Sequence, residues 1–291
     1  MLNLAFFSLL ALGSPADDPP SVPPQWLSAA RPKVIARVVT VAPSLTELLY
    51  GLGLYDRVVA VSRYDDYPPG VENLPRVGGF LDPNVEAIVG LRPDLVLAVP
   101  NQGNRPALDR LARLGVPVYV VPGNTFADVF VAIRAVGALF PGEGAKAAAR
   151  LEAELRAELR RLEEARAGRG GPKVAVVYGY DPLILAGPGS FADTMLQVLG
   201  AQNLVSTGSA YPQYSAEALV KAAPEVILDA TEAHGVGAAP WARFTELPAV
   251  REGRVFAVPL GSLLRPGPRL LEGLRLLERL LYSTGSKSIS K

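Results

Sequence analysis

An internal repeat is the feature that most restricts how this chain of 291 residues can fold. Residues 84–97 read NVEAIVGLRPDLVL, and residues 215–228 read SAEALVKAAPEVIL. Glu86 aligns with Glu217, 131 positions later (217 − 86), and the other identities keep this offset. Each copy has the pattern of a short amphipathic helix, a proline followed by an acid, and a buried strand. We therefore expect two similar lobes, and a two-lobed protein commonly binds a ligand in the cleft between them.

Both halves of the chain alternate apolar, β-branched segments with amphipathic ones. Short turns separate the segments, an order typical of α/β folds in which helices cover both faces of a parallel sheet. We expect the first helix to begin with Ser44 as its N-cap and Glu47 completing a capping box. The expected strands are 37–41, 58–61, 95–99, 118–121, 173–177, 226–229 and 255–258. The expected helices include 105–114, 190–199 and 269–282.

Residues 142–168 carry the longest helical pattern of the sequence. They contain no proline, consist largely of strong helix formers, and place Glu152 four residues before Arg156, the spacing of a helical ion pair. About two dozen helical residues extend about 35–40 Å, which suits a strut between two lobes. A coiled coil is the alternative, but the segment has a single apolar stripe and lies between two α/β patterns. The stripe consists of Ala147, Leu151, Leu155, Leu159 and Leu162.

These patterns divide the chain into six parts. The apolar run 2–12, followed by small residues, predicts a secretory signal peptide, although no basic residue precedes it; a buried first helix is the alternative. No later segment has the length and apolar character of a transmembrane helix. The expected parts are a signal peptide (1–16), a Pro-rich linker (17–36), an N-terminal lobe (37–141), a connecting helix (142–169), a C-terminal lobe (170–283) and a polar tail (284–291).

Composition excludes several classes of function. The chain has no cysteine, which excludes disulfides, thiolate catalysis and lipid attachment at an N-terminal cysteine. Its single histidine, His234, makes histidine metal clusters and His-based triads hard to build; we expect an exposed loop residue, with iron or haem ligation as the alternative. The net charge of +1, without a basic block, argues against nucleic acid binding. No nucleophile–base pair stands out, so we expect neither an enzyme nor a resident cofactor or metal.

Aromatic side chains lie at the expected ends of several strands. Tyr64 follows the second strand, and Phe80 lies in the loop before the first copy of the repeat. Tyr178 ends the strand that begins at residue 173, and Tyr211 precedes the second copy. Open α/β sheets bind ligands at the carboxyl ends of their parallel strands. Aromatic faces with a few polar groups suit a large, flat, partly apolar ligand, although we expect some of these rings to pack beneath loops.

The run RVVTVAPSLTELLYGLGLYDRVVAVSRYDDYPP, residues 37–69, resembles the first lobe of the cobalamin-binding periplasmic proteins. The resemblance continues through NVEAIVGLRPDLVLA, the long helix and YPQYSAEALV, and covers residues 37–281. These proteins belong to the helical-backbone (class III) substrate-binding proteins of ABC importers, a class that also serves haem and ferric siderophores. The resemblance implies two α/β lobes joined by one long helix, modest hinge motion, and capture of a corrinoid, with cobalamin as the expected ligand, in the cleft between the lobes.

The resemblance also implies ligand contacts. Tyr64 matches the stacking tyrosine of the motif SxYxDYPP, and Tyr178 matches an aromatic residue at the end of the first strand of the second lobe. Phe80 and Tyr211 stand where cobalamin binders commonly have tryptophans, so stacking is retained with smaller rings. Arg265, in LLRPGPR, matches a polar residue on the ligand side.

Glu86 and Glu217 match the two glutamates, one on each lobe, that dock onto arginines of the transporter's membrane subunits. Each residue alone also fits an ordinary exposed helix glutamate, and charge at such a rim mostly aids steering and orientation. Together with the composition, the resemblance implies a monomeric, soluble periplasmic protein without a lipoprotein cysteine. Its expected partners are the permease subunits of an ABC importer.

Three other functions are alternatives. A haem or ferric-siderophore binding protein of the same class would use Tyr64 or Tyr67 as an iron ligand, but siderophore sites usually need several basic residues in the cleft. A two-lobed cleft enzyme, such as a glycosyltransferase, is disfavoured by the strut helix and by the lack of a catalytic constellation. An adhesion or sensing protein that retains the fold is the third alternative.

Overall fold

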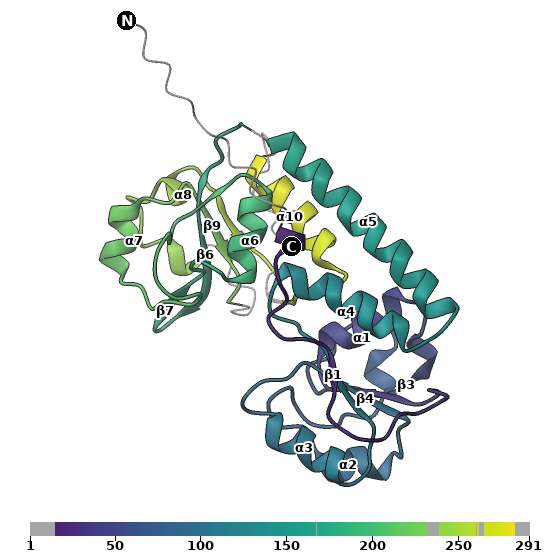
Figure 1. The fold of residues 1–291 in the computed structure, drawn as a ribbon. Helices are drawn as coiled ribbons and strands as arrows, with labels where there is room; N and C mark the ends of the chain where they lie inside the picture. Colours follow the sequence, from purple (N-terminus) through teal and green to yellow (C-terminus); the bar gives the residue numbers. More distant parts are fainter. Residues whose placement is uncertain (1–14, 167, 232–238, 260, 262–264, 283–291) are drawn as a thin grey trace, which may run out of the picture.

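The molecule consists of two α/β lobes and one long helix, α5 (Glu143–Arg166), which runs along both of them (Figure 1). The predicted strut helix is therefore confirmed, and so is the class of fold. No helix within the described part of the chain combines the length and apolar character needed to cross a membrane. The computed structural model describes residues 15–166, 168–231, 239–259, 261 and 265–282.

The N-terminal lobe contains a five-stranded sheet in the order β1-β5-β4-β2-β3. Four strands run parallel, and each lies within one residue of its predicted ends, because β-branched runs buried on both faces are a strong signal. The short β1 joins the edge of the sheet antiparallel to β5. The strands are β1 (Gln25–Trp26), β2 (Val38–Thr40), β3 (Val58–Ala60), β4 (Leu95–Ala98) and β5 (Val118–Val120).

The C-terminal lobe contains a second five-stranded sheet, in the order β10-β9-β6-β7. Its edge strand β7 is antiparallel to β6, and β8 pairs with the first residues of β6. The central strand β6 continues three residues beyond its predicted end, up to the hairpin with β7. The strands are β6 (Lys173–Tyr180), β7 (Leu183–Leu185), β8 (Gln202–Asn203), β9 (Val226–Asp229) and β10 (Val255–Ala257).

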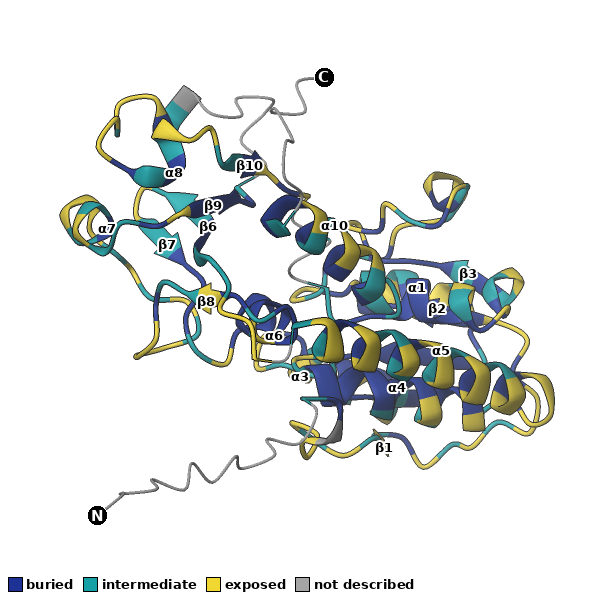
Figure 2. Cartoon of the chain, turned by 90° about the horizontal axis from the view of Figure 1, so that it is seen from above, coloured by how far each residue is buried: buried dark blue, intermediate teal, exposed yellow. Residues whose placement is uncertain are grey.

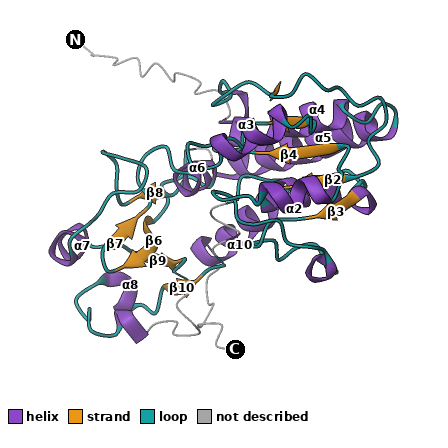
Figure 3. Ribbon diagram, turned by 90° about the horizontal axis from the view of Figure 1, so that it is seen from below, coloured by secondary structure: helices purple, strands orange, loops and turns teal. Residues whose placement is uncertain are grey.

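Three apolar clusters hold the layers together. The central cluster joins one face of each sheet to α1, α4, α5, α6 and α10, so it continues from one lobe into the other. Outer clusters lie between the first sheet and α2 and α3, and between the second sheet and α7 and α8 (Figure 3). The other α-helices are α1 (Pro43–Gly51), α2 (Val85–Gly90), α3 (Arg105–Arg113), α4 (Phe126–Ala138), α6 (Phe191–Val198), α7 (Ala216–Ala222), α8 (Pro248–Arg251) and α10 (Leu270–Tyr282). Short 3₁₀ turns lie at Pro15–Asp17, Tyr55–Arg57, Val71–Asn73 and Ala239–Trp241.

The apolar stripe of α5 faces the central cluster, and the opposite side of the helix is exposed (Figure 2). The predicted ion pair between Glu152 and Arg156 is present at 3.0 Å. Close packing of α5 on α4 requires a glycine, because a Cβ atom on Gly137 would lie 2.4 Å from the Cβ of Ala148. The buried leucines of the stripe are Leu155, Leu159 and Leu162.

The two copies of the repeat fold alike, down to single hydrogen bonds. The side chain of Asn84 caps α2 by accepting from the N–H of Ala87 at 2.9 Å. In the same way the side chain of Ser215 caps α7 by accepting from the N–H of Ala218 at 3.0 Å. These caps satisfy N–H groups that have no partner within the helix. The repeat in the sequence is therefore a repeat in structure.

Each copy then turns through a left-handed residue into its strand. Arg92 has a φ of 48° and Ala223 a φ of 50°, a conformation that non-glycine residues seldom adopt. The acid after the following proline fixes this turn to the neighbouring strand. Asp94 accepts the main-chain N–H just before β2 at 2.8 Å, and Glu225 accepts the first N–H of β6 at 2.8 Å. The proline–acid pair of the repeat thus fastens each helix to the strand beside the one that follows it, β2 in the first lobe and β6 in the second.

The start of α1 differs from the prediction. Ala42 is the N-cap residue, no side chain caps the helix, and Ser44 lies inside the first turn. The prediction was wrong because Pro43 occupies the first helical position, where its missing N–H costs nothing and its fixed φ favours a helix. Glu47 consequently has no capping role, and its side chain is buried.

The Pro-rich segment 17–36 packs on the N-terminal lobe rather than extending from it. It contains β1, and the hydroxyl of Ser21 donates to a carboxylate oxygen of Asp128 at 2.7 Å, in the first turn of α4. Three predicted features lie outside the described residues: positions 1–14 of the expected signal peptide, the loop residue His234 and the polar tail 284–291.

Candidate ligand-binding site

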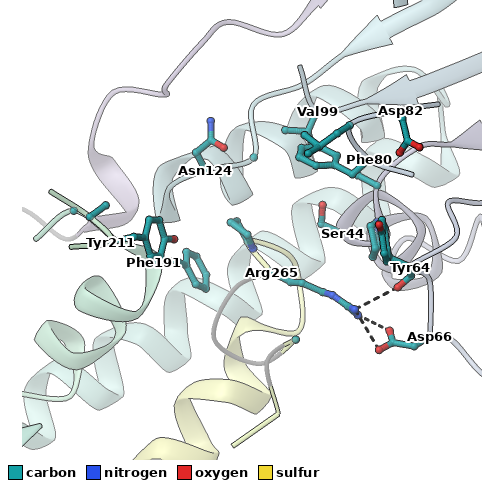
Figure 4. A pocket seen from close by; sticks show the side chains of 18 residues that line it. Ser44, Tyr64, Asp66, Phe80, Asp82, Val99, Asn124, Phe191, Tyr211 and Arg265 are labelled. Atoms are coloured by element: carbon teal, nitrogen blue, oxygen red, sulfur yellow. Dashed lines mark hydrogen bonds and ion pairs between the residues drawn. The ribbon is translucent and has the colours of Figure 1, made fainter. Parts of the chain in front are cut away.

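A cavity of about 930 Å³ opens between the two lobes (Figure 4). On one side its wall is formed by residues that follow β2, β3, β4 and β5, at the carboxyl ends of the parallel strands. On the other side it is formed by residues that precede α6 and α7 and by the segment that leads into α10. This is the position at which open α/β sheets bind ligands.

Three of the four predicted aromatic contacts line this cavity. Tyr64 and Phe80 lie on the side of the N-terminal lobe, and Tyr211 lies on the side of the C-terminal lobe (Figure 4). Tyr64 and Tyr211 are 57% and 50% exposed, so both rings have free surface for a ligand. Rings that face a cavity from two lobes suit a large ligand with flat or apolar surfaces.

Tyr178 does not line the cavity but lies behind Tyr211. The two rings meet edge to face, with centroids 5.5 Å apart. Burial, followed by the nearby Tyr211, raises the pKa of the Tyr178 hydroxyl, and the described residues provide no hydrogen-bond partner for it. In this conformation Tyr178 therefore supports the ring of Tyr211.

The lining also includes Phe191, which the sequence reasoning missed. Phe191 begins α6, directly after its N-cap Ser190, and its ring lies 4.7 Å from that of Phe126 at the start of α4. This contact joins the two lobes beside the cavity. The predicted N-cap at Ser190 places the apolar Phe191 at the start of a helix. Local sequence patterns cannot identify its contact with Phe126, which lies 65 positions away (191 − 126).

Arg265, the predicted polar contact, lines the cavity but is already bound by protein acceptors, among them Asp66 (Figure 4). Its Nη1 donates to Glu47 at 3.3 Å and to one oxygen of Asp66. Its Nη2 donates to the other oxygen of Asp66 at 3.2 Å and to the main-chain carbonyl of Tyr64 at 3.4 Å. A guanidinium has four terminal N–H groups, so each one has an acceptor here.

The two carboxylates that hold Arg265 have different environments. Glu47 is 2% exposed, and burial raises its pKa, although the charges of Arg265 and Arg269 oppose this effect. Asp66 lies at the cavity wall. Partial burial raises its pKa, but the hydrogen bonds and charge of Arg265 outweigh burial and hold the pKa below its usual range. Asp66 is therefore the carboxylate that a ligand meets as an anion.

A second ion pair lies on the other side of Tyr64. Asp82 lines the cavity and accepts from Arg63 at 2.6 Å, and the guanidinium of Arg63 lies 5.8 Å from the centre of the Tyr64 ring. Tyr64 is thus flanked by two arginine–aspartate pairs. Within the residues that line the cavity, each aspartate has an arginine partner.

The described residues include no group of three or more His, Asp or Glu side chains placed to hold a metal ion. Tyr67, one of the two tyrosines considered for iron, does not line the cavity. Its ring lies against the guanidinium of Arg269 at 4.1 Å and packs edge to face on Tyr50 at 5.4 Å. Tyr64 is the candidate of that pair whose side chain faces the cavity.

Glu86 and Glu217 lie in the first turns of α2 and α7, exposed and away from the cavity lining. These two helices lie at the ends of the lobes remote from α5 (Figure 1). The two glutamates differ in their surroundings. Glu86 forms an ion pair with Arg110 of α3 at 2.9 Å, whereas Glu217 has no ion pair within the described residues. Their position permits contact with a partner at both lobes.

The segment from residue 38 to residue 260 matches the periplasmic binding protein family. The chain belongs to this family. An ABC transporter substrate-binding lipoprotein of Bacillus subtilis, YvrC, is 30% identical over 253 residues, which cover 84% of this chain and 80% of that protein.

Solved structures of the family share the fold. The periplasmic vitamin B12-binding protein BtuF of Vibrio cholerae is 31% identical, with a TM-score of 0.72 over 84% of this chain and 96% of that one. The periplasmic haem-binding protein RhuT of Roseiflexus sp. RS-1, in its apo form, is 25% identical, with a TM-score of 0.77 over 85% and 98%. The helical-backbone architecture of this periplasmic binding protein is therefore shared by binders of different tetrapyrrole-like ligands.

Proposed function

We propose that this periplasmic binding protein captures a corrinoid, with cobalamin as the expected ligand, and delivers it to an ABC importer. The observation that carries the proposal is the pair of half-exposed rings, Tyr64 and Tyr211, which face one cavity of about 930 Å³ from opposite lobes. Phe80 and Phe191 add apolar surface between them. The identity of 31% with a vitamin B12-binding protein supports a corrinoid over other flat ligands.

The proposed activity is binding and release, without a chemical change in the ligand. The protein would act in the periplasm as a soluble monomer, with no resident cofactor. The transporter's permease subunits would contact Glu86 and Glu217, one on each lobe, and release would follow when they move the lobes apart. The absence of a lipoprotein anchor stays a prediction, because the Bacillus relative is a lipoprotein.

Haem is the second candidate, and one observation favours it. The side chains of Tyr64 and Tyr211 both line the cavity, and a tyrosine hydroxyl is an iron ligand in some haem proteins. Against it, the arginine of the described cavity lining has all its terminal N–H groups bound to protein acceptors. It therefore offers the haem propionates no unpaired cation.

Titration of the purified protein with cyanocobalamin and with hemin, followed by absorbance, tests the proposal. We expect saturable binding of cyanocobalamin, at one molecule per chain, and weaker binding of hemin. A Soret shift with hemin and no binding of cyanocobalamin would contradict the corrinoid proposal and favour the haem alternative.

A further inference from the structure

The geometry around Asp66 points to a role that the proposed contacts do not include. Asp66 follows β3, whereas Arg265 lies 199 positions later, in the segment that leads into α10. Both oxygens of the Asp66 carboxylate accept hydrogen bonds from the guanidinium. Oδ1 accepts from Nη1, and Oδ2 accepts from Nη2 at 3.2 Å. Two-point pairs of this kind fix geometry more strongly than single contacts do. The pair therefore sets the charge of this wall of the cavity.

Asp66 leaves Arg265 with little to offer a carboxylate-bearing ligand. The remaining terminal N–H groups bind Glu47 and the carbonyl of Tyr64. The side chain of Asp66 is 66% exposed, so its negative charge faces the cavity, while that of Arg265 is 23% exposed. An incoming carboxylate would meet a like charge and would have to displace Asp66 before it could bind the arginine.

An uncharged amide meets the opposite situation. Its N–H groups can donate to the exposed oxygens of Asp66 without breaking the ion pair, because a carboxylate accepts several hydrogen bonds. The second pair, Asp82 with Arg63, gives the other side of Tyr64 the same character. The polar groups around the Tyr64 ring thus favour ligand groups that donate hydrogen bonds and disfavour ligand groups with a negative charge.

We propose that Asp66 is a specificity determinant that holds Arg265 in a neutral ion pair. The cavity then favours ligands that carry side-chain amides over ligands that carry carboxylates. The inference rests on the proposed function, since a corrinoid carries side-chain amides where other tetrapyrroles carry carboxylates. In the sequence, Asp66 lies between Tyr64, which lines the cavity, and Tyr67.

The test compares ligands that differ only in this group. Cyanocobalamin and its three monocarboxylic acids, each with one side-chain amide hydrolysed, are titrated into the wild type and into Asp66→Asn. We expect the wild type to bind at least one of the acids about tenfold more weakly than cyanocobalamin, the size of one lost charge-assisted contact. Asp66→Asn removes the negative charge and one of the two acceptor oxygens that hold Arg265, so it should remove most of that difference.

Two further variants make the result specific. Glu272→Gln removes a nearby exposed carboxylate that pairs with Arg269 and does not line the cavity, so it should leave the ratio of affinities unchanged. Adding Arg265→Gln to Asp66→Asn should abolish the gain for the acid. Equal ratios in the wild type and Asp66→Asn for all three acids, in folded proteins of matched circular dichroism, would overturn the proposal.

Failure of the proposed function gives a different result. If the wild type binds hemin and not cyanocobalamin, the corrinoid proposal fails, and the role of Asp66 is then tested with hemin against its dimethyl ester. In that pair Asp66→Asn should strengthen binding of the free acid by about tenfold relative to the ester. An unchanged ratio between hemin and its ester would contradict the role of Asp66 by itself.

Discussion

Among single residues, Glu47 links the fold to the cavity. Its carboxylate is buried within α1 and lies 3.3 Å from Arg265 and 3.7 Å from Arg269. A buried carboxylate can stay in place when a partner of opposite charge offsets the cost of burial. Glu47 thereby holds the arginine whose other side faces Asp66. Glu47 from the interior and Asp66 from the surface thus position the charged wall of the cavity together.

The raised pKa of Glu47 makes a prediction about stability and pH. Burial makes the folded chain bind more protons at Glu47 than the unfolded chain does when the pH lies between the raised pKa and the ordinary value of 4.5. Wild-type stability therefore rises as the pH falls toward this value, because the folded state binds more protons. Glu47→Gln cannot take up this proton. We expect the free energy of unfolding of the wild type, relative to Glu47→Gln, to increase in urea titrations as the pH is lowered from neutral toward 4.5. A constant or shrinking difference would contradict the assigned environment.

Among the elements, the two copies of the repeat show what a sequence pattern specifies. Both helices are capped by a side chain, both end in a left-handed turn, and both are fixed by an acid to a neighbouring strand. The left-handed residue is Arg92 in one copy and Ala223 in the other. Neither is a glycine, so each copy retains a strained position at the same point.

Relief of that strain is the expected effect of Ala223→Gly. Left-handed backbone costs an alanine about 1–2 kcal/mol, while glycine loses more entropy on folding, so a net stabilisation of about 0.5–1 kcal/mol is expected. The matched control is Ala222→Gly, at the last residue of α7, where glycine should destabilise by up to about 1 kcal/mol. Denaturant titration of both variants checks the pair. Destabilisation by Ala223→Gly would show that the turn does not carry this strain.

The exposed first turns of α2 and α7 carry the proposed docking contacts. Reversing both Glu86 and Glu217 to lysine should abolish uptake of labelled cyanocobalamin by cells that depend on this protein, because like charges would face the transporter's basic residues. Affinity for the ligand should stay nearly unchanged, since neither residue lines the cavity. A matched reversal at Glu154, exposed on α5, should leave uptake intact. Loss of ligand affinity in the double variant would exclude a role confined to docking.

The elements were largely predictable from the sequence, and the charged site was not. Buried β-branched runs and the stripe of α5 have strong local periodicity, so their strands and helix were identified within a few residues. Ser44 was wrongly predicted as the N-cap of α1. Serine and proline both mark helix starts, and here Pro43 takes the first helical position, so Ala42 is the N-cap. The partners of Arg265 lie 199 and 218 positions away, a distance over which no local pattern operates.

In the whole molecule, the two lobes share one core. The central cluster contains residues of both sheets and of the helices between them, and α5 is tied to α10 by ion pairs such as Glu158 with Arg275 at 3.0 Å. The contact of Phe126 with Phe191 adds a junction beside the cavity. A continuous packed core resists large relative motion of its parts. This architecture favours modest hinge motion on binding.

A shared core also predicts that the lobes unfold together. The chain has two tryptophans, Trp26 in the N-terminal lobe and Trp241 in the C-terminal lobe. Trp26→Phe and Trp241→Phe each leave one lobe with a fluorescent reporter. In each variant the urea midpoint from fluorescence should coincide with that from circular dichroism, as for a two-state transition. Separated midpoints in either variant would mean that one lobe unfolds without the other.

The central claim is that rings from both lobes hold a corrinoid in the cavity, and isothermal titration with cyanocobalamin tests it most directly. The account predicts one ligand per chain and a loss of affinity of about tenfold for each of Tyr64→Ala and Tyr211→Ala, the size of one aromatic contact. Tyr50→Ala, which removes an exposed ring outside the cavity, should bind as the wild type does. Absence of binding in the wild type, or unchanged affinity in both cavity variants, would contradict the account.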